Sequence, residues 1–557
     1  MIEFDLLASR PHAFMGYVCE IGVLEMRVRS LLALLLALAL VAAACGEDTD
    51  TASPSDDPAE TTAPTETDAE PETTTTLPPT TTSTTAAPES QATEAFIGLQ
   101  LEPPTLDLTA SPAAAIPQVL LYNVYETLVR LQPDGSITGL LADSWDVSED
   151  GLTYTFNLHD GVTFHSGDPL TAEDVVFSIT NVTSNEEHPF NSTFAPISGV
   201  TAVDDSTVEV TLSQVSASLL FFMTQGQGAI LNEASMDSIE NSADGSGPFQ
   251  FGEWNVGDSI VLNRSDDYWG DPALLETVTF RYITDPNALN NAMLGDQLDL
   301  VAGVSAPELL EAFESDDRFT VQTGLTFGEV TVSLNGRRAP FDDVLVRQAV
   351  SHAIDRQAVI DLAYAGYGVP IGTFSTPLDP WYEDLTGVYD YDPDRARELL
   401  EEAGATDLTV EMVLPPPSYA SRGGEIIASQ LGEVGITANI TNVEWGVWLE
   451  DVFANYDFDM SIVAHVEPLD LAQYGNAEYY WGNDSPSVAP LLEQADSEPD
   501  EDTRNALYTQ VLEEITAQAA DAWIFNLPQL SVSKTGLTGY EVNLPGSLDV
   551  TQLAINS

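Results

Sequence analysis

Hydrophobic and polar positions divide the chain into three stretches of different character. An unbroken apolar run occupies residues 31–44, and residues 46–92 are mostly Thr, Pro, Ala, Asp, Glu and Ser. From residue 94 onward, short apolar and polar segments alternate to the C-terminus. A long polar stretch cannot bury enough apolar surface to offset its ordering entropy, so we expect a disordered spacer followed by a folded region.

The folded region alternates strand and helix patterns, which indicates a mixed α/β class. Two-residue periodicity predicts strands at 154–158, 207–212 and 259–262. Helical periodicity predicts helices over 344–363 and 393–403. Asp392 provides an N-cap for the second helix, Pro393 fits its first turn, and Gly404 follows its last periodic residue as a stop.

The apolar run has the layout of a secretory signal. Residues 26–30 carry two arginines, the run is too short to span a bilayer of about 30 Å, and small residues precede Cys45. We therefore expect translation to start at Met26 rather than Met1 or Met15, with residues 1–25 an upstream start artefact. The segment before Cys45 resembles a bacterial lipoprotein box, which implies a signal peptide at 26–44, a lipidated Cys45 and a spacer at 45–93.

The charge balance excludes some partners. The chain has 16 basic and 89 acidic residues, a net charge of −73, and Lys534 as its only lysine. This charge opposes binding to nucleic acid or to anionic lipid headgroups, so we expect contact with the membrane through the lipid alone. After cleavage only Cys45 would remain of the two cysteines, which leaves no internal disulfide.

Several motifs occur in an order that resembles the peptide, dipeptide and nickel family of ABC-importer solute-binding proteins. The resemblance extends over residues 94–557, and its motifs lie at 133–135, 141–145, 151–156, 161–167, 170–175, 245–249, 267–270, 339–343, 346–356 and 391–393.

The resemblance implies a two-lobed α/β fold of the periplasmic-binding-protein type, with an extra subdomain in lobe I and a hinge of two crossing strands. Lobe I would comprise residues 94–327, lobe II residues 328–525, and residues 526–557 would return to lobe I. The chain would cross near 326–334 and again near 524–529. The ligand would be enclosed between the lobes by hinge closure.

Comparison with peptide-binding members places candidate ligand residues in lobe II. Glu467 falls where those members have an aspartate for the ligand's ammonium, and Asp470 follows it. A carboxylate buried on closure needs a cation to offset its desolvation. The arginine that dipeptide receptors offer to the ligand's carboxylate falls at Leu414, which disfavours a dipeptide specialist. His465 is the imidazole nearest to the position at which nickel-chelate receptors have a histidine. It does not coincide with that position, which disfavours a nickel-chelate receptor.

Aromatic and cleft-loop residues complete the predicted site. Six rings cluster around the acidic loop: Trp445, Trp448, Tyr474, Tyr479, Tyr480 and Trp481. Trp481 is expected to be more exposed, whereas core packing remains an alternative for Trp445 and Trp448. On the facing lobe the resemblance implies that two loops line the cleft, with these candidates: Asp107, Gln225 and Gln227. No cofactor and no metal site are expected.

The resulting hypothesis is a monomeric, lipid-anchored extracytoplasmic receptor. It would bind an oligopeptide-like, amine-bearing solute and deliver it to the transmembrane subunits of an ABC permease. A receptor for a sugar, opine or metal chelate remains an alternative. Motifs for serine, zinc and phosphate chemistry are absent from the sequence, but a secreted hydrolase with paired carboxylates stays open because acids are abundant.

The ammonium assignment predicts the effect of Glu467→Gln. Removing the charge should weaken an amine ligand by about 1.5–3 kcal/mol, the range for hydrogen bonds to charged groups. Calorimetric titration of both proteins with the same amine measures it, and unchanged affinity would contradict the assignment.

Overall fold

The computed structural model describes residues 92–186, 188–466, 468–482, 485–543 and 546–556. The expectations for the signal, for Cys45, for the spacer and for Glu467 concern residues outside this part. All of these described residues belong to one compact unit. Among the described residues, no helix has the length and apolar character needed to cross a bilayer.

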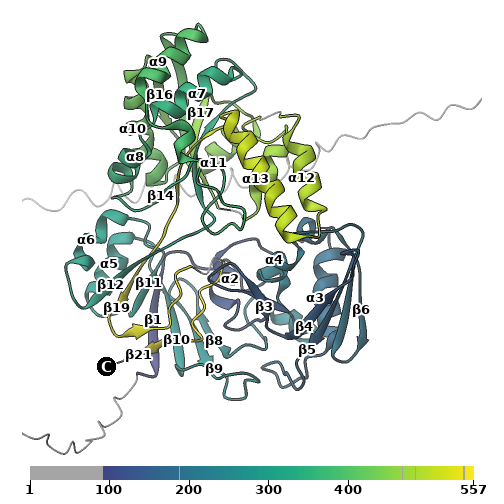
Figure 1. Ribbon diagram of the computed structural model, residues 1–557. Helices are drawn as coiled ribbons and strands as arrows, with labels where there is room; N and C mark the ends of the chain where they lie inside the picture. The colour runs from purple at the N-terminus through teal and green to yellow at the C-terminus, as the bar shows by residue number, and fades with distance from the viewer. Residues whose placement is uncertain (1–91, 187, 467, 483–484, 544–545, 557) are drawn as a thin grey trace, which may run out of the picture. The chain divides into compact units, whose positions relative to one another are not determined.

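Two large sheets form the framework (Figure 1). The first has the order β12-β19-β11-β1-β10-β9-β8, with β1 (Glu94–Leu99), β8 (Phe249–Asn255), β9 (Ser259–Arg264), β10 (Thr277–Tyr282), β11 (Leu300–Ala302), β12 (Phe319–Gly324) and β19 (Gln529–Lys534). The second has the order β14-β18-β13-β17-β15-β16, with β13 (Glu329–Leu334), β14 (Val369–Pro370), β15 (Leu408–Leu414), β16 (Ile436–Asn442), β17 (Met460–His465) and β18 (Ala522–Asn526).

A four-stranded antiparallel sheet is inserted in the first lobe between β1 and β8. Its order is β4-β5-β7-β6, with β4 (Ala142–Val147), β5 (Thr153–Leu158), β6 (Ile197–Asp204) and β7 (Thr207–Leu212). Two small pairs complete the strands: β2 (Val129–Leu131) with β3 (Ile137–Gly139), and β20 (Leu537–Thr538) with β21 (Ala554–Ile555).

Helices pack on these sheets. In the first lobe they are α2 (Ala115–Leu120), α3 (Ala172–Ser184), α4 (Leu219–Met223), α5 (Pro286–Leu294) and α6 (Glu311–Glu314). In the second they are α7 (Val344–Ala353), α8 (Arg356–Ala363), α9 (Pro393–Glu402), α10 (Ser418–Glu433), α11 (Trp445–Trp448), α12 (Val488–Asp496) and α13 (Glu501–Ala517).

The chain passes between the two large sheets twice. Residues 325–328 join β12 to β13, and residues 527–528 join β18 to β19. Hydrogen bonds clasp the two segments together: the Asn526 side-chain amide donates to the carbonyls of Thr326 and Gly328, both at 2.8 Å. The Thr326 hydroxyl donates to the Leu527 carbonyl at 2.6 Å. The predicted two-lobed α/β fold with a two-strand hinge is confirmed.

Most of the local predictions from periodicity and capping residues are confirmed. The three predicted strands correspond to β5, β7 and β9, and Asp392 caps α9 by accepting from the amides of Asp394 and Arg395. Gly404 has a φ of +66°, which suits a helix stop. The single helix predicted over 344–363 is wrong, because Asp355 interrupts it and accepts from the Ala358 amide as the N-cap of α8.

The two faces of the second-lobe sheet differ in polarity. On β13, Val330, Val332 and Leu334 belong to the apolar core that contains residues of α7, α8 and α10. The alternate positions Glu329, Thr331 and Ser333 are buried and polar. Side chains alternate between faces along a strand, so these polar groups share the opposite face.

A buried carboxyl group adjoins the aromatic cluster of the second lobe. The Leu334 amide donates to Asp521 Oδ1 at 2.8 Å, and the Tyr474 hydroxyl donates to Oδ2 at 2.7 Å. Burial raises the pKa of Asp521 to about 7, although both donors and the charge of Arg347 oppose this rise. The carboxyl group thus completes the backbone hydrogen bonding at the end of β13.

The hinge clasp predicts that Asn526→Ala destabilises the protein. The substitution removes both side-chain bonds to the crossing segment, which should lower the free energy of unfolding by about 1–3 kcal/mol. Denaturant unfolding measures this change. Asn439→Ala is the control, because the Asn439 side chain is exposed and bonds only to Glu411 among the contacts described. Equal effects of the two variants would contradict the role of the clasp.

The raised pKa of Asp521 predicts a pH dependence of stability. The unfolded carboxyl loses its proton near pH 4, whereas the folded one keeps it to about pH 7. The folded state therefore binds more protons in this window, and stability falls as the pH rises through it. The Asp521→Asn side chain cannot ionise and lacks this contribution. The thermal midpoint of the variant should therefore rise relative to that of the wild type as the pH increases from 5 to 7. A constant difference would refute the assignment.

Candidate functional site

Two pockets adjoin the crossing segment at residues 325–328. Leu325 and Thr326 line a cavity of about 220 Å³, here called the lobe I pocket. The next residue, Phe327, lines a second and much smaller cavity, here called the acidic pocket. Consecutive residues of one hinge segment thus reach both pockets, which makes the hinge the centre of the candidate site.

The acidic pocket combines carboxylates with aromatic rings. Its volume is about 10 Å³, close to the space that one water molecule occupies. The lining consists of three acids, three aromatic side chains and two leucines: Glu329, Asp379, Asp470, Phe327, Phe374, Trp381, Leu469 and Leu471. Carboxylates supply hydrogen-bond acceptors and negative charge, and ring faces attract cations. The pocket therefore suits a small cationic group.

Each acid reaches the acidic pocket from a different element. Glu329 is the first residue of β13 and pairs in register with His465, the last residue of β17. Asp470 follows Leu469, whose left-handed backbone (φ +66°) turns the chain after β17. Asp379 lies in the loop after β14.

Asp379 is held by its own loop. Its Oδ2 accepts from the Thr376 amide at 2.7 Å and from the Ser375 hydroxyl at 3.0 Å. Burial raises the pKa of Asp379 to about 6, against the effect of these donors. A cation bound beside this carboxyl group would favour its ionised form.

The lobe I pocket has mostly polar and aliphatic walls. They come from α2 and its N-cap, the strand ends of the first sheet, the hinge and the C-terminal segment: Leu101, Ala114, Ala115, Gln118, Ala302, Leu325, Thr326, Gln529, Tyr540, Glu541, Val542, Gly546, Ser547 and Leu548. Glu541 is the only charged residue in this set. Amides and hydroxyls of this kind can bind the backbone of an extended ligand.

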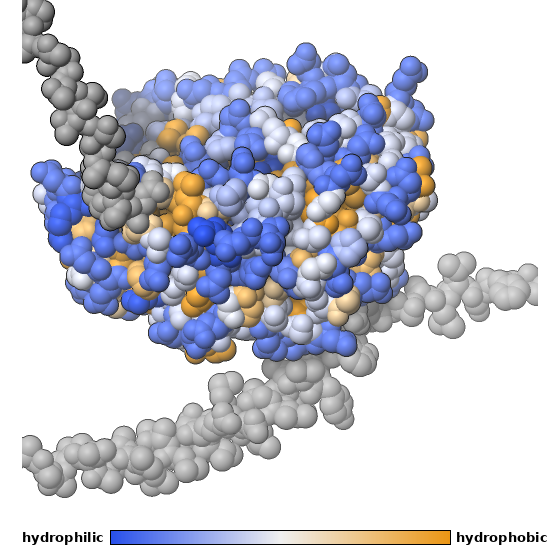
Figure 2. Space-filling view, turned by 90° about the horizontal axis from the view of Figure 1, so that it is seen from below, coloured by the Kyte–Doolittle hydropathy of each residue, from blue (hydrophilic) through white to orange (hydrophobic). Residues whose placement is uncertain are grey.

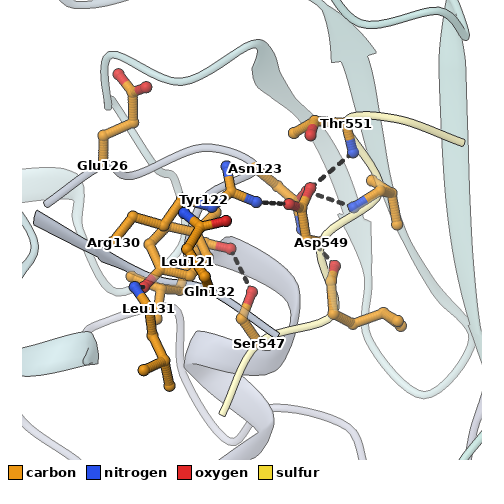
Figure 3. Close-up of polar contacts among 12 residues, drawn as sticks. Leu121, Tyr122, Asn123, Glu126, Arg130, Leu131, Gln132, Ser547, Asp549 and Thr551 are labelled. Atoms are coloured by element: carbon orange, nitrogen blue, oxygen red, sulfur yellow. Dashed lines mark hydrogen bonds and ion pairs between the residues drawn. The ribbon is translucent and has the colours of Figure 1, made fainter. Parts of the chain in front are cut away.

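The C-terminal segment that lines this pocket is fixed to the region after α2 (Figure 3). The Ser547 hydroxyl donates to the Leu121 carbonyl at 2.8 Å, and Asp549 forms an ion pair with Arg130. Asn123 binds the segment on both sides, donating to the Leu548 carbonyl and accepting from the Val550 amide. These contacts hold one wall of the lobe I pocket in place.

A buried acid, Glu126, stabilises the segment that follows α2. Glu126, drawn apart from the ion pair in Figure 3, accepts from Ser246, Tyr268 and Trp269. Burial raises its pKa to about 7, against the effect of these three donors. With its acceptors filled by protein groups, Glu126 is a structural residue rather than a ligand contact.

The structure places the predicted lobe II residues in two layers. Asp470 lines the acidic pocket, and His465 lies behind it with Nδ1 3.6 Å from Asp470 Oδ2. Trp448, Tyr474 and Trp481 are buried in the aromatic cluster of the second lobe.

The expectation that Trp481 is exposed is wrong. Only 1% of its surface is accessible, because its ring stacks on Tyr474 with a centroid distance of 4.6 Å and meets Phe374 edge-on. Trp445 is the exposed member, at 42%, and stacks on Trp448.

The remaining predicted residues lie away from the acidic pocket. Leu414 is fully buried at the end of β15. Asp107 accepts from the amide and hydroxyl of Thr109 and so stabilises its own turn. Gln227 is buried, whereas Gln225 lies beside Gly546 of the lobe I pocket.

Sequence reasoning missed most of the acidic pocket. Glu329 and Asp379 were not candidates, and neither were the rings of Phe327, Phe374 and Trp381. Glu329 carried one usable signal, since it is a single acid at the start of the buried strand β13. Asp379 carried none, because the chain has 89 acidic residues.

One face of the molecular surface is mainly polar. Figure 2 shows a face that is largely hydrophilic, with separate hydrophobic patches rather than one continuous apolar area. Among the described residues, no group of three or more His, Cys, Asp or Glu side chains is arranged to hold a metal ion.

Comparison with known proteins gives relatives of one kind. Heme-binding protein A of Haemophilus influenzae is 28% identical over 363 residues, which are 58% of this chain and 65% of that protein. The dipeptide-binding protein of Escherichia coli is 31% identical over 346 residues, covering 56% of this chain and 64% of the relative. The match thus spans slightly less than two thirds of each relative, and both are binding proteins rather than enzymes.

A solved structure and a family model agree with this result. The crystal structure of the ABC transporter substrate-binding protein CtaP from Listeria monocytogenes superimposes with a TM-score of 0.76 at 23% identity, covering 84% of this chain and 100% of that one, which shows the shared fold. The family model for bacterial extracellular solute-binding proteins, family 5, matches residues 136–486. The chain belongs to the family 5 bacterial extracellular solute-binding proteins.

Proposed function

We propose that this protein captures a small solute with a protonated amine, most simply an oligopeptide, and delivers it to an ABC permease. The ligand's ammonium group enters the acidic pocket, and the rest of the ligand extends along the hinge toward the lobe I pocket. The peptide preference is supported by the relationship to a dipeptide-binding protein and by the polar walls of the lobe I pocket.

The observation that carries this proposal is the composition of the acidic pocket. Three carboxylates and three aromatic rings surround a space of about 10 Å³. An ammonium group is about as large as a water molecule and donates up to three hydrogen bonds. Burying carboxylates without a cation is costly, so a bound amine would offset the cost that closure imposes on them.

The lining of both pockets favours a longer peptide over a dipeptide. Neither described lining includes an arginine or a lysine. Leu414, where the family resemblance would put a carboxylate-binding arginine, is buried in the apolar core. The ligand's carboxyl terminus therefore has no cationic partner in these pockets, whereas amides and hydroxyls are available for a peptide backbone.

Transport would follow from hinge closure. A ligand shifts an open-to-closed equilibrium only by its higher affinity for the closed form. Contacts to both lobes provide that difference, since the acidic pocket draws its acids from the second lobe and the lobe I pocket lies across the hinge. The lipidated Cys45 would keep the receptor at the outer surface of the membrane near its permease, and the spacer would give it reach.

Two measurements on residues 94–557 test the proposal. Mass spectrometry of the solute released by denaturation should give peptides of similar length. Calorimetry of the ligand-free protein should show binding of Ala-Ala-Ala, and N-acetylation of the peptide should weaken it about tenfold to a hundredfold, because the charged hydrogen bonds are lost. A co-purifying sugar, opine or metal chelate, or equal affinity for both peptides, would contradict the peptide proposal.

A further inference from the structure

A row of hydrogen-bonding side chains leads from the core of the second lobe to the acidic pocket. The Ser333 hydroxyl lies 2.5 Å from the Tyr480 hydroxyl, which lies 3.0 Å from His465 Nε2. On the other edge of the imidazole, Nδ1 lies 3.6 Å from Asp470 Oδ2. Asp470 lines the acidic pocket, so the row ends at the candidate ligand site.

The protons in this row have one favourable order. Burial lowers the pKa of His465 to about 3 and raises that of Tyr480, so the imidazole is neutral and the phenol is protonated. If His465 Nε2 carried the proton, the bare Nδ1 would face the carboxylate of Asp470, lone pair to negative charge. With the proton on Nδ1, His465 instead presents N–H to Asp470, Tyr480 donates to Nε2, and Ser333 donates to Tyr480.

The row is rigidly supported. Ser333 lies on β13 and His465 on β17, which are neighbouring strands of one sheet. Arg337 fixes the segment that carries Tyr480 by donating to the carbonyls of Ala477, Tyr479 and Tyr480 at 2.6–2.7 Å. The positions of the phenol and the imidazole are therefore set by the sheet and by this arginine.

We propose that Ser333, Tyr480 and His465 are positioning residues that fix the proton on His465 Nδ1 and thereby orient the Asp470 carboxylate toward the ligand's ammonium. This inference rests on the proposed function for its ligand, but it also makes a claim about the ligand-free protein. The left-handed backbone of Leu469 agrees with it, since strained backbone is retained where a side chain must be held in one direction.

A double-mutant cycle tests the inference with Ala-Ala-Ala and its N-acetylated form as probes. Tyr480→Phe removes only the hydroxyl and should weaken Ala-Ala-Ala about threefold to tenfold, the value of one hydrogen bond, while leaving the acetylated peptide unchanged. In the Asp470→Asn background the same substitution should have no further effect, because Tyr480 acts through Asp470. Ser333→Ala is the second variant if Tyr480→Phe does not fold.

Tyr389→Phe is the matched control, because the buried Tyr389 hydroxyl donates to the Thr516 carbonyl within the second lobe and neither residue lines either pocket. Two results would overturn this inference but leave the proposed function intact. One is that Tyr480→Phe weakens the binding of both peptides equally, and the other is that its effect adds to that of Asp470→Asn. If the wild-type protein binds neither peptide, the proposed function and the ligand role of Asp470 both fail.

A measurement without ligand tests the proton order directly. Nitrogen-15 NMR of histidine-labelled protein, with His465 assigned through His465→Gln, should show the Nδ1–H tautomer in the wild type. Tyr480→Phe should change the nitrogen shifts of His465. An Nε2–H tautomer in the wild type would overturn the inference even where peptide binding is confirmed.

Discussion

The clasp between the two crossing segments is the constraint on which the rest of the structure depends. Asn526 and Thr326 tie residues 326–328 to residues 526–527 by three hydrogen bonds. Because Thr326 and Phe327 are consecutive, the segment that joins the sheets also supplies walls to both pockets. Under the proposed function, a ligand that contacts both pockets would therefore touch the segment about which the lobes rotate.

Repulsion among the pocket acids bears on the open-to-closed equilibrium of the proposed receptor. The chain carries a net charge of −73, and three carboxylates line one small pocket beside the hinge. Charges at the surface are screened within about 8 Å at physiological ionic strength, but buried ones are screened much less. The pocket acids consequently oppose an empty closed state more strongly than the surface acids do. Under the proposed function, a bound ammonium group would offset the repulsion among these acids and so favour the closed state.

The sequence predicted what depends on local pattern. Strands β5 and β7 and helix α9 follow from periodicity and capping residues that lie next to one another in the chain. The break at Asp355 was missed because apolar periodicity continues across it, although aspartate is a strong N-cap and the local signal was present. The acidic pocket could not be assembled in this way, since Glu329, Asp379 and Asp470 come from distant segments of a chain rich in acids. The predicted exposure of Trp481 was wrong for a related reason. Its burial depends on contacts with Phe374 and Tyr474, and the sequence does not reveal that these residues lie nearby.

Most aromatic residues of the second lobe lie behind the acidic pocket, and only Phe374 and Trp381 of that cluster belong to its lining. Alternation along β13 puts Glu329, Thr331 and Ser333 on one face, a polar stripe beneath a predominantly apolar cluster. Farther from the hinge, aromatic side chains form hydrogen bonds with polar groups of this sheet. The Tyr480 hydroxyl bonds to the Ser333 hydroxyl, and the Trp448 indole donates to Ser461 of the neighbouring strand. Only the end at Glu329 opens into the acidic pocket. The acidic pocket thus lies at one end of a buried polar layer, and the rings that cover the rest of this layer exclude water from it. In such a medium of low dielectric constant, the ammonium group of the proposed ligand would interact more strongly with the pocket acids than it would in water.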